Sequence, residues 1–262
     1  MPAPRLLRPL ILIAVLGALV VVLIALPASL VKRFLPPPVE AQEFSGTLWH
    51  GSAANVIVGG RSVGAVEWRL HPWSLVEFTL AADLHWVKVG FVADGRIDIS
   101  SRSLTLRDVQ GGGPIEDLRE FGIPEGWRGT ATIKIREFKA LLANGAGSGP
   151  SWAAAVGDLE VFNLAARQVA GGADLGGFAL HLANSAITPG ADATAELADT
   201  GGPLEVQATI HFASGGRTGM LSGTVKARPD APAGLISALE SLAQLHPADR
   251  RGAIPVDLEF TL

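Results

Sequence analysis

The chain has 262 residues, a formal net charge of −4, and neither cysteine nor tyrosine. The missing cysteines exclude disulfide bonds, thiolate metal sites and thiol catalysis, and the charge balance lacks the basic footprint of a nucleic-acid-binding protein. Its 31 glycines, spread among short alternating apolar runs, predict a mainly β fold of one large domain or two modest ones.

Residues 10–31 form a nearly unbroken apolar segment. A short stretch that carries Arg5 and Arg8 precedes it. As a helix at about 1.5 Å per residue the segment reaches roughly 33 Å, which is enough to cross a hydrocarbon core of about 30 Å. A cleaved signal peptide is the alternative, but the run is longer than a usual signal core and no clear cleavage site follows it. We therefore expect a transmembrane helix at residues 10–31, preceded by a short cytoplasmic tail at residues 1–9.

A proline-rich linker is expected at residues 32–43. Its three consecutive prolines, residues 36–38, form either a stiff polyproline II spacer or a simple stop to the preceding helix. Both interpretations predict the same layout, in which a folded body follows the membrane segment directly.

The stretch from Phe44 to Leu70 predicts a β-hairpin. An extended run rich in valine and isoleucine reaches Val58, two glycines turn the chain, and Ser62–Leu70 returns as a strand with Val66, Trp68 and Leu70 on one face. Three glycines stand where a strand prefers a side chain and therefore predict bulges or close backbone approach: Gly46, Gly51 and Gly64.

Alternation continues through residues 78–86 and 97–109, and the glycines at 111–113 then predict a break. Pro114 suits the first position of a short helix, whose first turn holds Glu116 and Asp117. A further strand is expected at residues 129–138. Together these elements make a first β-half at residues 44–142.

A glycine-rich loop at residues 143–150 separates this half from a second one at residues 151–262. The second half repeats glycine, leucine and alanine positions of the first at offsets of 111 to 112 residues. It also repeats the order of strand, short helix and closing strand, with its helix at residues 231–245. We expect the two similar halves, each with one short helix, to form one continuous curved antiparallel β-sheet or half-barrel.

An ordered series of short motifs resembles the type II secretion system protein N family, also called general secretion pathway protein N. The likeness covers nearly the whole chain, and its motifs are GTLWHGSA at 46–53, LxP at 70–72, SWAAA at 151–155, LGGF at 175–178, GGPL at 201–204 and LSGTVKARP at 221–229. The resemblance implies an accessory inner-membrane component with a short cytoplasmic tail and its bulk in the periplasm.

The residues themselves give no sign of catalysis, and neither a cofactor nor a metal is expected. The six histidines are scattered, and no zinc-protease motif, nucleophile elbow or phosphate loop occurs. The nearest carboxylate groupings, Asp94 with Asp98 and Glu116 with Asp117, are accounted for by a strand end and the first turn of a helix.

Four tryptophans in the first half are the candidate site: Trp49, Trp68, Trp73 and Trp86. Core packing explains them most simply. The sharper alternatives are an apolar groove for a lipid chain and a docking surface for another membrane-anchored subunit. Nearby, Glu67 and Arg69 share a strand face and form either a polar rim or an ordinary surface pair.

Two functions follow. The first is a non-enzymatic accessory component of type II secretion, with other inner-membrane subunits of that system and the bilayer, through residues 10–31, as partners. It would serve the export of folded proteins across the outer membrane. The alternative is a lipid-handling periplasmic module similar to the AsmA-like proteins, with lipid as its ligand. A long apolar lining left uncovered would favour the alternative. Nucleic acid is not expected as a partner of either.

Overall fold

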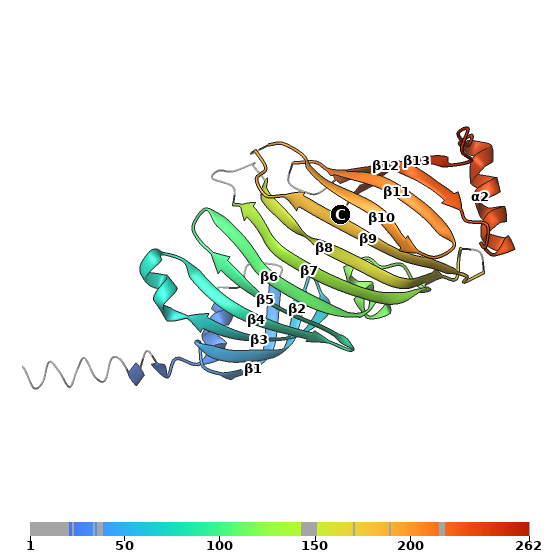
Figure 1. The fold of residues 1–262 in the computed structure, drawn as a ribbon. Helices are drawn as coiled ribbons and strands as arrows, with labels where there is room; N and C mark the ends of the chain where they lie inside the picture. Colours follow the sequence, from blue (N-terminus) through green and yellow to red (C-terminus); the bar gives the residue numbers. More distant parts are fainter. Residues whose placement is uncertain are drawn as a thin grey trace, which may run out of the picture.

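The fold is one open antiparallel sheet in which every strand bonds to its neighbours in the chain, from β1 to β13 (Figure 1). The computed structural model describes residues 21–22, 24–33, 35, 39–142, 151–169, 171–188, 190–214 and 218–261. The strands within them are β1 (Val39–Gly46), β2 (His50–Val58), β3 (Arg61–His71), β4 (Leu80–Lys88), β5 (Phe91–Ile99), β6 (Ser103–Pro114), β7 (Trp127–Leu141), β8 (Ser151–Ala166), β9 (Asp174–Asn184), β10 (Ala193–Gly201), β11 (Leu204–Phe212), β12 (Thr218–Ala227) and β13 (Ile254–Thr261).

Four helical segments accompany the sheet in the described residues: the 3₁₀ helices η1 (Ala28–Arg33), η2 (Pro72–Glu77) and η3 (Ile115–Phe121), and the α-helix α2 (Ala233–Leu245). Because strands alternate in direction, η3 and α2 lie at one end of the sheet and η2 lies at the other. The predicted mainly β fold with one continuous antiparallel sheet is therefore confirmed. The expectation of one short helix in each half is wrong for residues 44–142, which hold both η2 and η3, because the chain after β3 also forms a short helical turn that begins at Pro72.

The strand register places one residue of each strand in line across the whole sheet. One such line, which we call the polar row, consists of Ser45, Ser52, Glu67, His85, Asp94, Gln110, Lys134, Asp158, His181, Glu196, Thr209, Ser222 and Asp257. The adjacent line, on the opposite face because side chains alternate, is the apolar row: Phe44, Ala53, Val66, Trp86, Ala93, Gly111, Ile133, Leu159, Leu180, Leu197, Ala208, Gly223 and Val256.

The face that carries the apolar row holds the core. Every member of that row is buried or half-buried, and the two helices at one end pack onto this face. Ile115 of η3 joins a buried cluster with Phe91 and Ala131. Leu235 of α2 joins another with Ala166, Leu175 and Leu204. The apolar lining is thus covered partly by the curl of the sheet and partly by the helices.

Two sequence expectations need correction in detail. Residues 44–58 form two strands rather than one run, because Gly46 takes a φ of 81° and the chain turns through Thr47, whose backbone N–H donates to the His50 carbonyl. The glycines at 111–113 continue β6 instead of ending it. A Cβ on Gly111 would lie 2.6 Å from that of Ala93, so glycine lets two strands approach closely there. The helix η3 accordingly begins after Pro114.

The predicted role of the hairpin glycines is confirmed. The turn falls at Gly59-Gly60, between β2 and β3. A Cβ on Gly51 would meet the Trp68 ring at 2.6 Å, and one on Gly64, where φ is 110°, would meet the Val87 carbonyl oxygen at 2.5 Å.

The expected transmembrane segment and loop fall partly or wholly outside the described residues. This holds for residues 1–20 and 143–150. Residues 28–31 belong to η1, which lies beside β1. No helix within the described ranges combines the length and the apolar character needed to cross a bilayer.

Candidate functional site

The four predicted tryptophans occupy different settings. Trp68 and Trp86 lie half-buried on the apolar face of adjacent strands. Their indole N–H groups donate to the backbone carbonyls of Leu48, at 2.9 Å, and Val63, at 2.7 Å. Both rings are therefore fixed in orientation and contribute to packing as well as to any surface.

Trp49 and Trp73 lie at the end of the sheet where β3 runs into η2. Trp49 is half-buried and lines a cavity of about 640 Å³ together with Ile24 and Pro72. Trp73, the residue after Pro72, is 85% exposed. The cavity joins the end of the N-terminal apolar segment to the beginning of η2.

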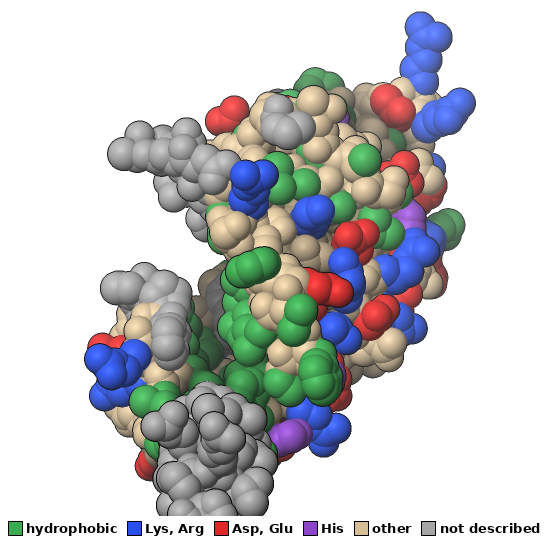
Figure 2. All heavy atoms as spheres, turned by 90° about the vertical axis from the view of Figure 1, so that its left-hand side faces the viewer, with side chains coloured by type: hydrophobic (Ala, Val, Ile, Leu, Met, Phe, Trp, Pro, Cys, Tyr) green, Lys and Arg blue, Asp and Glu red, His purple; other side chains and the backbone are tan. Residues whose placement is uncertain are grey.

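The short segment from Trp73 to Phe78 is the most exposed apolar surface in the described part of the chain. Trp73, Val76 and Phe78 are 85%, 75% and 91% exposed, and Leu75 is 47% exposed. Large side chains exposed together in this way are unusual for a protein surface and mark an interaction site. We call these four residues the η2 patch. Figure 2, which views the left-hand side of Figure 1, shows hydrophobic side chains gathered on this side of the molecule.

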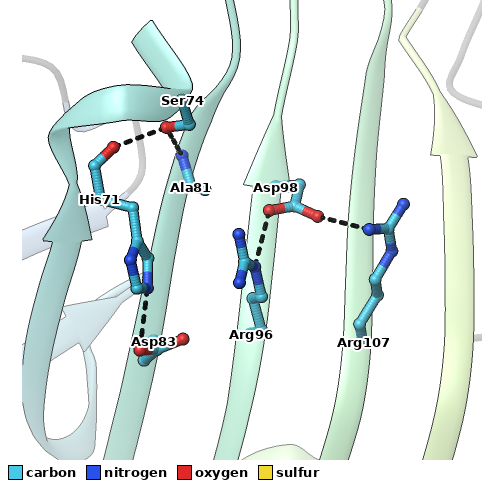
Figure 3. A network of polar contacts seen from close by, with 7 residues as sticks. All are labelled: His71, Ser74, Ala81, Asp83, Arg96, Asp98 and Arg107. Carbon is cyan, nitrogen blue, oxygen red and sulfur yellow. Dashed lines mark hydrogen bonds and ion pairs between the residues drawn. The ribbon is translucent and has the colours of Figure 1, made fainter.

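The η2 patch is held in a defined shape by its own backbone. The Ser74 hydroxyl donates to the His71 carbonyl at 2.7 Å and accepts from the Ala81 N–H at 3.1 Å (Figure 3). Phe78 adopts a left-handed conformation, with φ of 54°, and its N–H closes the turn onto Leu75. The apolar side chains are thus presented outward by a structured turn.

The opposite face of the sheet carries ion pairs, one within β5 and others between neighbouring strands. Asp98 bonds both Arg96, at 3.1 Å, and Arg107, at 3.2 Å, and His71 contacts Asp83 at 2.9 Å (Figure 3). The His71–Asp83 pair is partly exposed and adds little to stability, whereas the Asp98 side chain is only 14% exposed and lies between two arginines. These pairs make this face hydrophilic.

Two histidine–aspartate pairs belong to the polar row. The His85 Nδ1–H donates to the Asp94 carboxylate at 2.6 Å, and His181 Nδ1 lies 2.5 Å from the Asp158 carboxylate. The hydrogen bond with Asp94 raises the pKa of His85 above its ordinary value. Each pair has its carboxylate directly opposite the imidazole on the next strand, so the two pairs are cross-strand contacts on the surface of the sheet.

A more buried ion pair tethers the start of the loop before α2. The Asp199 side chain, 10% exposed, accepts from the Val206 N–H at 2.9 Å and pairs with Arg228. Burial raises the pKa of Asp199, but the combined hydrogen bonds and the guanidinium outweigh it and lower the pKa. The pair has a structural role, since it joins β10, β11 and the segment after β12.

Within the described residues no group of three or more histidine, aspartate or glutamate side chains could hold a metal ion. The sequence pattern singled out Trp73 but not Leu75, Val76 and Phe78, the other members of the η2 patch. The available signal was the density of large apolar residues, Trp73 to Phe78, inside a turn that ordinarily carries polar ones.

The arrangement defines a class of protein: an open β-sheet protein with an apolar, partly covered face, a hydrophilic opposite face and an exposed apolar turn, all of them features suited to binding. The comparisons identify the family. The sequence model of "Type II secretion system (T2SS), protein N" matches residues 37–257, and the chain belongs to that family of secretion-system components.

A relative from Aeromonas hydrophila, "Type II secretion system protein N", is 39% identical over 84 residues. That match covers 31% of this chain and 32% of the relative, so it spans about a third of the relative's length. No solved structure matches the chain. The family predicted from the motifs is confirmed, and the lipid-handling alternative is not favoured.

Proposed function

We propose that the chain is a non-enzymatic accessory component of the type II secretion machine, anchored in the inner membrane by the part of the apolar segment 10–31 that precedes η1, with its sheet in the periplasm. The observation that carries this proposal is the family match, which extends over residues 37–257 and so covers nearly the entire sheet. Its role is to assist the export of folded proteins across the outer membrane, in contact with the other inner-membrane subunits.

The sheet offers a physical means of contact with such a subunit. The chain order leaves β1 and β13 as the two outer strands of the described sheet. In β13, Leu258 is 57% exposed and the residues from Asp257 to Glu259 are all exposed. A strand whose outer side is not paired can accept a strand from another protein through backbone hydrogen bonds.

Site-specific photocrosslinking in cells that carry a complete secretion system tests this proposal. A photoreactive residue replaces Leu258, Trp68 or Trp73, and Val89, 77% exposed in the turn between β4 and β5, serves as the control position. We expect identified inner-membrane secretion subunits to be captured from at least one of the first three positions and not from position 89.

Capture of lipid alone, or of no secretion subunit from any position in cells that secrete normally, would overturn the partner assignment. Protease treatment of spheroplasts tests the topology separately. The sheet is expected to be digested when only the periplasmic side is accessible, and protection of the sheet would place it on the wrong side of the membrane.

A further inference from the structure

The η2 patch is an exposed apolar surface that the family match by itself does not explain. Its two largest side chains, Trp73 and Phe78, are almost completely exposed, and Val76 between them is 75% exposed. The Ser74 hydrogen bonds fix the backbone of the turn from which these side chains project into solvent. Such a surface requires a partner of matching chemistry.

The neighbourhood of the patch identifies that partner. Ile24, at the end of the N-terminal apolar segment, lines the same cavity as Pro72, the first residue of η2. Val21, Val22 and Ile24 are themselves 65%, 59% and 63% exposed. The exposed apolar surface of the N-terminal segment therefore adjoins the η2 patch.

Backbone contacts fix the N-terminal segment at the end of the sheet where η2 lies. The Leu48 N–H donates to the Leu26 carbonyl at 2.7 Å, and Pro27 pairs with Thr47 across an isolated bridge. These contacts tie the N-terminal segment to the turn between β1 and β2, at the same end of the sheet as η2. A membrane that the N-terminal apolar segment enters would therefore also lie next to the η2 patch.

The composition of this end fits the headgroup region of a phospholipid bilayer. Tryptophan prefers that region because its ring is apolar and its N–H is polar. Lys32 and Arg33, both exposed in the last turn of η1, which runs beside β1, suit an anionic lipid surface. Glu77, exposed within η2, is an acid beside the patch and carries the opposite charge.

We propose that the η2 patch inserts into the surface of the inner membrane, with Trp73, Val76 and Phe78 among the lipid headgroups and upper acyl chains, beside the point where the N-terminal segment enters the bilayer. This second contact restrains the sheet relative to the membrane, whereas a single spanning segment would leave it free to tilt. The inference rests on the proposed membrane location of the chain.

The absence of cysteine from the sequence makes a direct test possible. A single cysteine replaces Val76 and carries an environment-sensitive fluorophore, and the full chain is reconstituted into vesicles of phosphatidylethanolamine and phosphatidylglycerol. Val89→Cys is the matched control. It replaces the same residue type at nearly the same exposure, 77% against 75%, at the opposite end of β4.

We expect the label at position 76 to emit at shorter wavelength and to be quenched by lipids that carry a spin label near the headgroup, while the label at position 89 remains water-like. Equal, unquenched emission from both sites in chains that float with the vesicles overturns the inference and leaves the anchor intact. Shielding of position 76 without lipid quenching also overturns it, because a second copy of the chain then covers the patch.

Flotation separates this inference from the proposed function. If the full chain fails to float with the vesicles, the anchor itself is wrong and the surface contact falls with it. Replacing Trp73 and Phe78 by serine provides a second measurement: the chain should still float, but the fluorophore at position 76 should lose most of its quenching. Unchanged quenching in that variant would contradict insertion by these side chains.

Discussion

Substitution of Phe91 by alanine tests whether the helix η3 and the sheet form a genuine core. Phe91 is the largest fully buried side chain of the described residues, with 0% exposure. Its ring lies 5.3 Å from the Trp86 ring, and it packs in one cluster with Ile115 of η3 and Ala131 of β7. Removing the ring leaves a cavity that these neighbours cannot fill without moving.

The magnitude follows from the burial. Loss of a fully buried phenylalanine ring costs about 3–5 kcal/mol of unfolding free energy. For a chain of this size each kcal/mol shifts the melting temperature by roughly 2–4 °C, so Phe91→Ala should melt about 12 °C below the parent protein. The matched control is Phe78→Ala, which removes the same ring from a position that is 91% exposed.

Thermal unfolding of the full chain in detergent, followed by circular dichroism and by tryptophan fluorescence, measures both variants. The control should melt within about 2 °C of the parent, since exposed substitutions rarely exceed about 0.5 kcal/mol. If Phe91→Ala melts together with Phe78→Ala, the ring is not part of a close-packed core. The account of η3 as a cover for the apolar face would then be wrong.

Three further outcomes are expected. Gly176→Ala should cost roughly 3 kcal/mol of unfolding free energy, because φ is +97° there and the new Cβ meets a backbone oxygen. Gly59→Ala, in open space at φ +58°, should cost only about 1 kcal/mol. Equal losses of unfolding free energy for the two variants in urea would contradict the clash. Because the pKa of His85 is raised in the fold, the stability it contributes is present below its ordinary value of about 6.5 and is lost as the pH rises through the higher folded pKa; Asp94→Asn should bring the pKa of His85 down in an NMR titration and remove that pH dependence. Arg228→Ala, which leaves the mostly buried carboxylate of β10 without its cation, should lower the melting temperature by about 6 °C, and an unchanged melting curve would show that the pair contributes nothing.

Much of the sheet could be predicted from the sequence because its physical signals are local. Alternation within each strand determines which face a side chain occupies, and the structure pairs Val66 with Trp86 and Trp68 with Leu84 on the apolar face. The turn at Gly59-Gly60 and the first-turn acids of η3 follow from equally short-range preferences.

What could not be predicted depends on contacts between strands. The glycines at 111–113 look like a break in one dimension, and only the closeness of β5 shows that they are strand residues selected for their lack of a side chain. The exposure of Trp73 and Phe78 likewise depends on the tertiary structure, because the same residue types in a strand would usually be buried in the core.

The internal duplication stays a prediction, with some support from matched positions. Gly64 in β3 and Gly176 in β9, which the offset aligns, both have positive φ, of 110° and 97°, and both would direct a Cβ at a carbonyl oxygen of the following strand. In the same way η3 stands between β6 and β7, and α2 stands between β12 and β13.

The unbroken order from β1 to β13 has a consequence for how the molecule is made. No strand has to wait for a distant part of the chain, so the search for each pairing is short and its entropic cost is low. When the polypeptide emerges from a translocation channel with its amino end first, each new strand can pair with the strand before it. During such synthesis the unpaired backbone is confined to the outer side of β1 and to the strand added most recently, which limits misassembly with other nascent chains.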